Sequence, residues 1–175
     1  MSDSTGYTHQ HVRTAQEIMA ELNGFSSRDS VSYRKQLEEL LGSVGDNVKI
    51  NFPFYCCIGK LIFIDDFTLI NSHCHFMDGG KIFIGRHTMI GPGVQIYTTH
   101  HPRIETKDES EIHYGMEYRP VKIGNGCWVG GCAILLPGVE IGDGTTIGAG
   151  SVVTKSIPAR YVAAGNPCRL INPVN

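Results

Sequence analysis

The stretch that decides the fold runs from residue 123 to residue 152 and reads, in blocks of six, IGNGCW VGGCAI LLPGVE IGDGTT IGAGSV. An aliphatic residue leads every block, and a small or β-branched residue stands fifth. Neither the helical period of 3.6 nor simple alternation produces a period of six. A parallel β-helix does, because each hexapeptide forms a short strand and a corner, and three hexapeptides complete one triangular coil.

The same period extends through most of the chain and predicts a β-helix over residues 46–158, with about five coils. A long gap at about 102–119 and two steps of eight interrupt it. We expect the lead residue to point inward, the fifth to sit at a crowded corner, and glycine to supply backbone angles that a Cβ atom would block. The upstream lead residues are Ile58, Ile64, Ile70 and Phe76, then Ile84, Ile90 and Ile96, with the steps of eight at 50–58 and 76–84.

The segment 1–45 lacks this period and predicts a small N-terminal helical cap, which an open coil end needs because its strand groups are unpaired. Thr14 and Glu17 have the spacing of a capping box, which predicts a helix that begins there and ends near Gly24. We expect disorder in residues 1–8 and an irregular, proline-containing tail over 159–175. A second helix that stops near Gly42 is predicted by the spacing of Leu37, Leu40, Leu41 and Val44.

Length and composition exclude several classes of protein. The 175 residues suggest one domain, and 15 basic against 17 acidic residues give a net charge of −2, which argues against nucleic acid as a partner. The longest apolar runs have four residues, too few to span a membrane. No basic, apolar leader opens the chain, and the six cysteines form no CxxC pair, so we expect reduced thiols and a cytoplasmic location.

The long gap in the period is the expected place for a functional site, since a loop of this length in a regular solenoid usually carries function. It begins with Thr98-Thr-His-His-Pro102 and returns at Arg119-Pro120. His100 and His101 therefore stand at its entrance, and histidine is the side chain best suited to proton transfer near neutral pH.

Several segments match a known family in the expected order: PFY at 53–55, GPGV at 91–94, YTTHHP at 97–102, WVGG at 128–131, PGVEIG at 137–142, GAGSVVTK at 148–155 and AGNP at 164–167. Between Ile50 and Ile171 the chain resembles the hexapeptide-repeat O-acetyltransferases that acetylate sugars, such as the maltose, galactoside and nodulation acetyltransferases. The resemblance implies a left-handed β-helix, a homotrimer with active sites between subunits, and acetyl-CoA as the donor.

The resemblance also assigns roles to residues of the loop and the coils. The catalytic histidine of the family precedes a proline, which identifies His101 rather than His100. Such an imidazole accepts the proton of the attacking hydroxyl and returns it to the leaving thiolate. The tetrahedral oxyanion needs fixed donors, one of which the resemblance places at the backbone N–H of Gly131. The other residues implied to contact coenzyme A are Ala149, Thr154, Lys155 and Arg169.

For the acceptor, the resemblance implies that Asn71 lies in the catalytic pocket, and that Met116 and Trp128 line it. Asp78, or the adjacent Gly79, falls near a family aspartate that binds the sugar. We therefore predict an acetyl-CoA-dependent O-acetyltransferase that acts on a hydroxyl of a small sugar or glycan precursor, by direct transfer.

Three alternatives stay open at this point. The acceptor could be an antibiotic or an amino acid, or the β-helix could be a scaffold without catalysis. His73 and His75 share a strand face and could hold zinc, as in the related carbonic anhydrases. The repeat argues against this metal reading, because it places Cys74 inward and both histidines outward, and no third ligand has the spacing of that family. We therefore expect no metal, although His75 could line the acceptor cleft.

Overall fold

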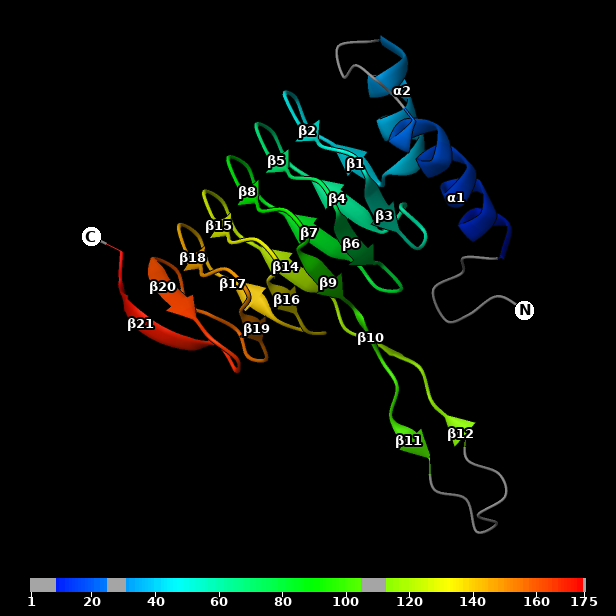
Figure 1. The fold of residues 1–175 in the computed structure, drawn as a ribbon. Coiled ribbons are helices and arrows are strands. Elements are labelled where there is room, and N and C mark those ends of the chain that lie inside the picture. The colour runs from blue at the N-terminus through cyan, green and yellow to red at the C-terminus, as the bar shows by residue number, and fades with distance from the viewer. Residues whose placement is uncertain (1–8, 25–30, 105–112, 175) are drawn as a thin grey trace.

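The computed structural model describes residues 9–24, 31–104 and 113–174; the predicted disorder of residues 1–8 lies outside them. Short parallel strands wind into a three-sided prism of about five coils, as the period predicted (Figure 1). Sheet A contains β1 (Ser43–Val44), β4 (Ile62–Ile64), β7 (Ile82–Ile84), β14 (Val121–Ile123) and β17 (Glu140–Ile141). Sheet B contains β2 (Lys49–Ile50), β5 (Leu69–Ile70), β8 (Met89–Ile90), β15 (Trp128–Val129), β18 (Thr146–Ile147), β20 (Tyr161–Ala164) and β21 (Arg169–Pro173). Sheet C contains β3 (Phe54–Cys56), β6 (Cys74–Met77), β9 (Gln95–Tyr97), β16 (Ile134–Leu135) and β19 (Val152–Val153).

The core is a stack of lead residues, one per strand. In sheet B, Ile70 pairs in register with Ile90, and Ile90 with Val129, and all three are buried. The fifth positions also point inward, as expected: Thr88, Cys127 and Ser151 are among the buried residues. The prism is therefore filled by stacked aliphatic rows, with small residues where the walls meet.

Glycine has two roles in the coils. The left-handed backbone angles occur at the fourth position of the hexapeptide, for example at Cys132 with φ 57° and Gly126 with φ 62°. Second-position glycines are needed instead because successive coils touch there: a Cβ atom on Gly91 would lie 2.5 Å from the Gly131 nitrogen. The prediction that glycine supplies unusual backbone angles is thus confirmed at the fourth position, and glycine has a second role at the second position, where coils touch.

We name the three corners of the prism after the sheets they join: corner AB, corner BC and corner CA. Cys56 pairs with Phe76, so Cys56 is the lead residue and Ile58 lies in a turn. The first step of eight therefore runs from Cys56 to Ile64, which corrects the predicted 50–58. Both steps of eight, and the long gap as well, fall at corner CA.

The long gap is an arm that leaves corner CA between β9 and β14 (Figure 1). Strand β10 (Thr99–His100) pairs antiparallel with β13 (Glu117–Tyr118), and β11 (Arg103–Ile104) pairs with β12 (His113–Tyr114). The predicted protruding loop is thus a two-stranded arm along its described part. His101 follows the first strand of this arm directly.

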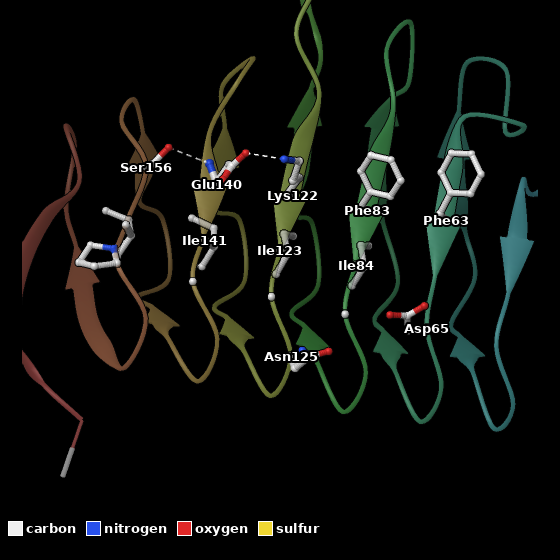
Figure 2. Close-up of a pocket in the computed structure, with 15 residues that line it drawn as sticks. Phe63, Asp65, Phe83, Ile84, Lys122, Ile123, Asn125, Glu140, Ile141 and Ser156 are labelled. Carbon is white, nitrogen blue, oxygen red and sulfur yellow. Dashed lines mark hydrogen bonds and ion pairs between the residues drawn. The ribbon is translucent and has the colours of Figure 1, made fainter.

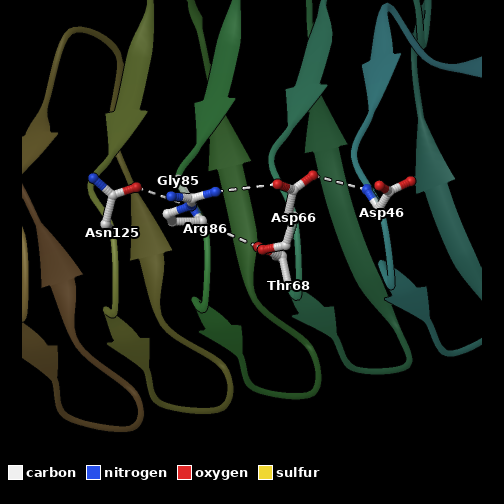
Figure 3. Close-up of polar contacts among 6 residues, drawn as sticks. All are labelled: Asp46, Asp66, Thr68, Gly85, Arg86 and Asn125. Atoms are coloured by element: carbon white, nitrogen blue, oxygen red, sulfur yellow. Dashed lines mark hydrogen bonds and ion pairs between the residues drawn. The ribbon is translucent and has the colours of Figure 1, made fainter.

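Corner AB is closed by side chains of its third positions (Figure 3). The Asp46 N–H donates to Asp66 at 2.8 Å, and the Arg86 N–H donates to Asn125 at 3.0 Å. The Asn125 N–H in turn donates to Asp143 at 2.8 Å. Each of these N–H groups thus finds an acceptor one coil further along.

Both ends of the prism differ from the predictions in detail. Helix α1 (His9–Asn23) already includes Thr14, whose hydroxyl donates to the Gln10 carbonyl at 3.0 Å, so the capping-box prediction is wrong. Helix α2 (Val31–Leu40) ends as predicted before Gly42. The tail is not irregular, because β20 extends sheet B and β21 folds back along it. Of the helices described, none has the length and apolar character to cross a bilayer.

Candidate active site

The residues predicted to form the site lie in two groups at opposite edges of sheet C. Corner BC, where the chain passes from sheet B to sheet C, contains Asn71, Gly131 and Ala149. Corner CA, where it passes from sheet C to sheet A, bears the arm with His101 and also Lys155. A single chain therefore does not bring the predicted base and the predicted oxyanion donor together.

His101 is exposed at the base of the arm, and a hydrogen bond to the backbone fixes the orientation of its ring. Its Nδ1 lies 3.1 Å from the carbonyl oxygen of Gly115, on the returning side of the arm. A carbonyl only accepts, so Nδ1 must carry the hydrogen, and Nε2 of the neutral ring is left with a lone pair. Since the Gly115 N–H donates to the Pro102 carbonyl at 2.9 Å, the group that orients the ring is itself fixed.

The returning strand of the arm also contributes two side chains that follow Gly115, the residue that orients the imidazole. Met116 is 56% exposed, and its sulfur accepts the hydroxyl of Tyr118. Tyr118 and Gly115 could not be predicted from the sequence, because the pairing of β10 with β13 brings the returning strand to the base of the arm. The other histidine, His100, is paired in that ladder with Glu117.

Asp78, predicted to contact the acceptor, is completely buried at corner CA. Its carboxylate accepts the N–H groups of Cys57, Ile58 and Gly59 at 2.8, 2.9 and 2.7 Å. Burial raises the pKa of Asp78 to about 6, although these three donors act in the opposite direction. In this position the carboxylate holds a turn of its own chain, and its geometry gives no support to a contact with an acceptor.

Corner BC differs from corner AB in one respect that matters for binding. Within the described part of the chain, the N–H groups of Gly131 and Ala149 donate to no acceptor. Both stand third in their hexapeptides, the position that corner AB closes with a side chain. Two backbone donors on successive coils are therefore available to a ligand, as an oxyanion or an amide carbonyl requires.

Two further predicted residues lie on this side of the prism. The Asn71 side-chain oxygen accepts from the Ser72 N–H at 3.1 Å and from Asn51 Nδ2 at 3.0 Å. These bonds fix the Asn71 amide in place, with its nitrogen still able to donate. Trp128 is 54% exposed on the outer face of sheet B, in register with Met89 and Thr146.

The residues predicted to contact the donor phosphates lie towards the last coils. Thr154 and Lys155 are exposed directly after β19. Arg169 opens β21 and is exposed, with Nη1 donating to the Cys168 carbonyl at 2.9 Å. Each cation is thus accessible to an anion, although Arg169 lies on sheet B and Lys155 at corner CA.

The histidine pair shows the predicted orientation. Cys74 is buried, whereas His73 and His75 are exposed, and the His75 ring stacks on Tyr55 with centroids 4.6 Å apart. Among the described residues, no three His, Cys, Asp or Glu side chains are grouped as a metal would require. In this part of the chain, no group of side chains supports the zinc alternative.

A groove on the outer face of sheet A lies apart from all these residues (Figure 2). The rings of Phe63 and Phe83 stack there at 5.1 Å. Further along, Lys122 pairs with Glu140 at 2.7 Å, and the Glu140 N–H donates to Ser156 at 2.9 Å. Lys122, Glu140 and Ser156 are thus occupied with one another.

Comparison with known proteins identifies the family to which this chain belongs. A model of the bacterial transferase hexapeptide family (six repeats) matches residues 120–155. The galactoside O-acetyltransferase of Escherichia coli is 35% identical over 159 residues, which cover 90% of this chain and 76% of that protein. The chain belongs to the hexapeptide-repeat acetyltransferase family.

Solved structures of this family superpose closely on the chain. A maltose O-acetyltransferase from Clostridium difficile has a TM-score of 0.85 and 37% identity, and the match covers 95% of this chain and 87% of that one. A galactoside acetyltransferase in complex with coenzyme A has a TM-score of 0.87 and 32% identity, with 95% and 82% covered. The predictions of a left-handed β-helix and of an acetyltransferase are thereby confirmed.

Proposed function

We propose that this acetyltransferase moves an acetyl group from acetyl-CoA to a hydroxyl of a small sugar or glycan precursor, with His101 as the general base. The observation that carries the proposal is the bond between His101 Nδ1 and the Gly115 carbonyl, because it leaves Nε2 ready to accept a proton. The relatives named for galactoside and maltose support a sugar as the acceptor.

The reaction needs no covalent intermediate on the enzyme. The acceptor oxygen attacks the thioester carbon as its proton passes to Nε2 of His101, which gives a tetrahedral oxyanion. The carbon–sulfur bond then breaks, and the imidazolium returns the proton to the thiolate of coenzyme A. Proton transfer of this kind contributes roughly 10²–10⁴-fold to the rate.

We infer that acetyl-CoA binds to the two unpaired N–H groups of corner BC and to the cations near the last coils. The free N–H of Gly131 would stabilise the oxyanion, and that of Ala149 would bind an amide carbonyl of the pantetheine arm. Thr154, Lys155 and Arg169 would contact the phosphates, which prefer charge-assisted hydrogen bonds. A structure of an acetyltransferase of this family in complex with acetyl-CoA, 29% identical with a TM-score of 0.86, supports this donor.

The separation of the two corners supports a homotrimer with its sites between subunits. The base lies at corner CA and the open donors at corner BC, so the complete site would combine corner CA of one chain with corner BC of its neighbour. Mixed oligomers test this arrangement directly. His101→Ala and Ala149→Tyr should each be nearly inactive alone, whereas co-expression of the two would restore part of the turnover; no restoration would contradict a shared site.

The proposed activity is tested by thiol release from acetyl-CoA across a panel of sugars, amino acids and antibiotics, with coenzyme A binding measured by calorimetry. We expect binding and turnover with a sugar. Turnover only with an antibiotic or amino acid would replace the acceptor class, and no binding of coenzyme A would indicate a scaffold. We place the enzyme in the cytoplasm, in keeping with six cysteine thiols that form no disulfide.

A further inference from the structure

Tyr118 lies where the returning strand of the arm rejoins corner CA. It pairs with Thr99 across the arm, and its ring covers the backbone of Gly79. A Cβ atom on Gly79 would lie 2.6 Å from Cε1 of Tyr118 and 2.5 Å from Oγ1 of Thr99. Because real Cβ atoms do not approach other atoms so closely, the ring and the threonine take the space that a side chain at position 79 would need.

The other end of the ring is also fixed. The Tyr118 hydroxyl donates to the sulfur of Met116, which directly follows Gly115, the residue whose carbonyl orients His101. The phenol therefore spans the distance from corner CA to the residues around the imidazole. A ring held at both ends presents a fixed surface, with little conformational entropy to lose when a ligand packs on it.

The surroundings of this ring are apolar or weakly polar. Met77, at the end of β6, is 41% exposed beside half-buried Tyr97, and Met116 is exposed on the arm. The two nearby carboxylates are committed elsewhere: Asp78 holds backbone N–H groups inside the prism, and Glu117 pairs with Arg119 at 2.9 Å.

We propose that Tyr118 determines acceptor specificity, by forming an apolar wall beside His101. The wall favours acceptors that carry an apolar or aromatic substituent over acceptors that are polar on every side. An apolar group gains by leaving water against the ring, whereas a hydroxyl pressed there loses its hydrogen bonds to water. The inference rests on the proposed function, since it concerns the acceptor side of the same site.

The test compares matched acceptors that differ only in this group, a phenyl glycoside and the corresponding free sugar, by their ratio of kcat/KM. We expect the wild type to prefer the phenyl glycoside. Tyr118→Ser removes the wall and should lower the ratio about tenfold or more, within the range of hydrophobic discrimination. Tyr118→Phe keeps the ring and should keep the ratio, and Glu117→Gln, on the neighbouring residue of the same strand, serves as the matched control.

A second variant approaches the wall from its other side and guards against simple misfolding of the arm. Gly79→Ala must displace the ring, so it should also lower the ratio, while the KM for acetyl-CoA stays unchanged in both variants. Transfer by Tyr118→Ser with the wild-type ratio would overturn this inference alone. A wild type that acetylates neither acceptor nor any other hydroxyl would overturn the proposed function and this inference with it.

Discussion

Corners AB and BC are built from the same turn, yet side chains accept most of the third-position N–H groups at corner AB, while those of Gly131 and Ala149 at corner BC stay open. At corner AB, a third-position side chain accepts the N–H of the coil before it in three places: Asp66 does so for Asp46 and Asn125 for Arg86 (Figure 3), and Asp143 does so for Asn125. At corner BC the same position holds Gly131 and Ala149, which have no such acceptor. The choice of residue at one position of the hexapeptide therefore decides whether a corner satisfies its own backbone or leaves donors for a ligand.

Corner CA differs from both because it departs from the period altogether. The two steps of eight and the arm place functional side chains at this corner, including the His101 imidazole, whose orientation is fixed by the Gly115 carbonyl. On the proposed function, the open corner supplies donors for developing negative charge and corner CA supplies the base. Each of the following predictions alters one corner and leaves the others intact.

The largest effect is expected from His101→Ala at corner CA. Loss of the base should lower kcat by about 10²–10⁴-fold, with the affinity for coenzyme A unchanged because corner BC is untouched. Turnover is measured by thiol release and affinity by calorimetry. His100→Ala is the matched control and should keep most of the turnover; a His101→Ala enzyme with near-wild-type kcat would refute the assigned base.

The open corner can be closed by a single substitution that copies corner AB. Ala149→Asn places a side-chain oxygen where Asp143 stands at corner AB, so that it can accept the Gly131 N–H. Occupying one oxyanion donor should lower kcat by about 10²–10³-fold. Ala149→Val adds bulk without an acceptor and should cost much less. Equal losses in the two variants would show that bulk, and not the hydrogen bond, was responsible.

The close approach of coils at corner BC predicts a stability difference between two glycines. In Gly91→Ala the new Cβ atom would meet the Gly131 nitrogen at 2.5 Å, and backbone cannot move aside, so we expect a loss of about 2–3 kcal/mol. Gly126 at corner AB has φ 62° but no neighbour within 4 Å of a Cβ atom, so Gly126→Ala should lose about 1 kcal/mol, from strain alone. Urea unfolding measures both, and the reverse order would contradict this account.

Asp78 at corner CA predicts a pH dependence of stability. Its pKa in the folded chain is about 6, above the ordinary value of 3.8, so the folded state holds the proton more tightly than the unfolded state does. This contribution is fully present below pH 4 and is lost as the pH rises through 6. Urea unfolding between pH 4 and 7 should show the decline in the wild type and not in Asp78→Asn.

The same substitution should also lower stability at neutral pH. An asparagine offers one acceptor oxygen to three N–H donors, and each buried donor left unpaired costs about 1–3 kcal/mol. Val153→Ala, in a coil that does not contact Asp78, provides a variant of comparable loss that should retain the pH slope. A slope shared by Asp78→Asn and the wild type would assign the titration to another group.

The fold was largely predictable, because the six-residue pattern recurs too many times to arise by chance, and each hexapeptide buries the same positions. The errors have local causes. A Thr-x-x-Glu pattern fits a helix start, but the Thr14 hydroxyl can equally bond to the carbonyl four residues back, as it does here. The tail contains prolines, yet an open edge of sheet B offers β20 a full partner, and Pro167 lies in the turn after it.

The site was less predictable, since it depends on how corners are placed in space. Sequence matching predicted a role for His101, but it could not predict the Gly115 carbonyl that sets its tautomer or the Tyr118 ring over Gly79, because both arise from strand pairing within the arm. The burial of Asp78 could not be predicted from the hexapeptide pattern either, because its carboxylate binds the backbone of a turn in the preceding coil.

The smallest effect is expected at corner AB, on the exposed side chain of Asp66. The N–H of Asp46 and then the guanidinium of Arg86 lower the pKa of Asp66 below its ordinary 3.8. A lowered folded-state pKa contributes stability that is present above 3.8 and lost as the pH falls through the folded value. Asp66→Asn keeps the acceptor for the Asp46 N–H and loses the charge, so its Tm should decline less than that of the wild type between pH 5 and 3. Asp66→Ala loses both the acceptor and the charge. If its Tm equalled that of Asp66→Asn at every pH, the hydrogen bond at this corner would contribute nothing to stability. The contrast with corner BC would then concern ligand binding alone.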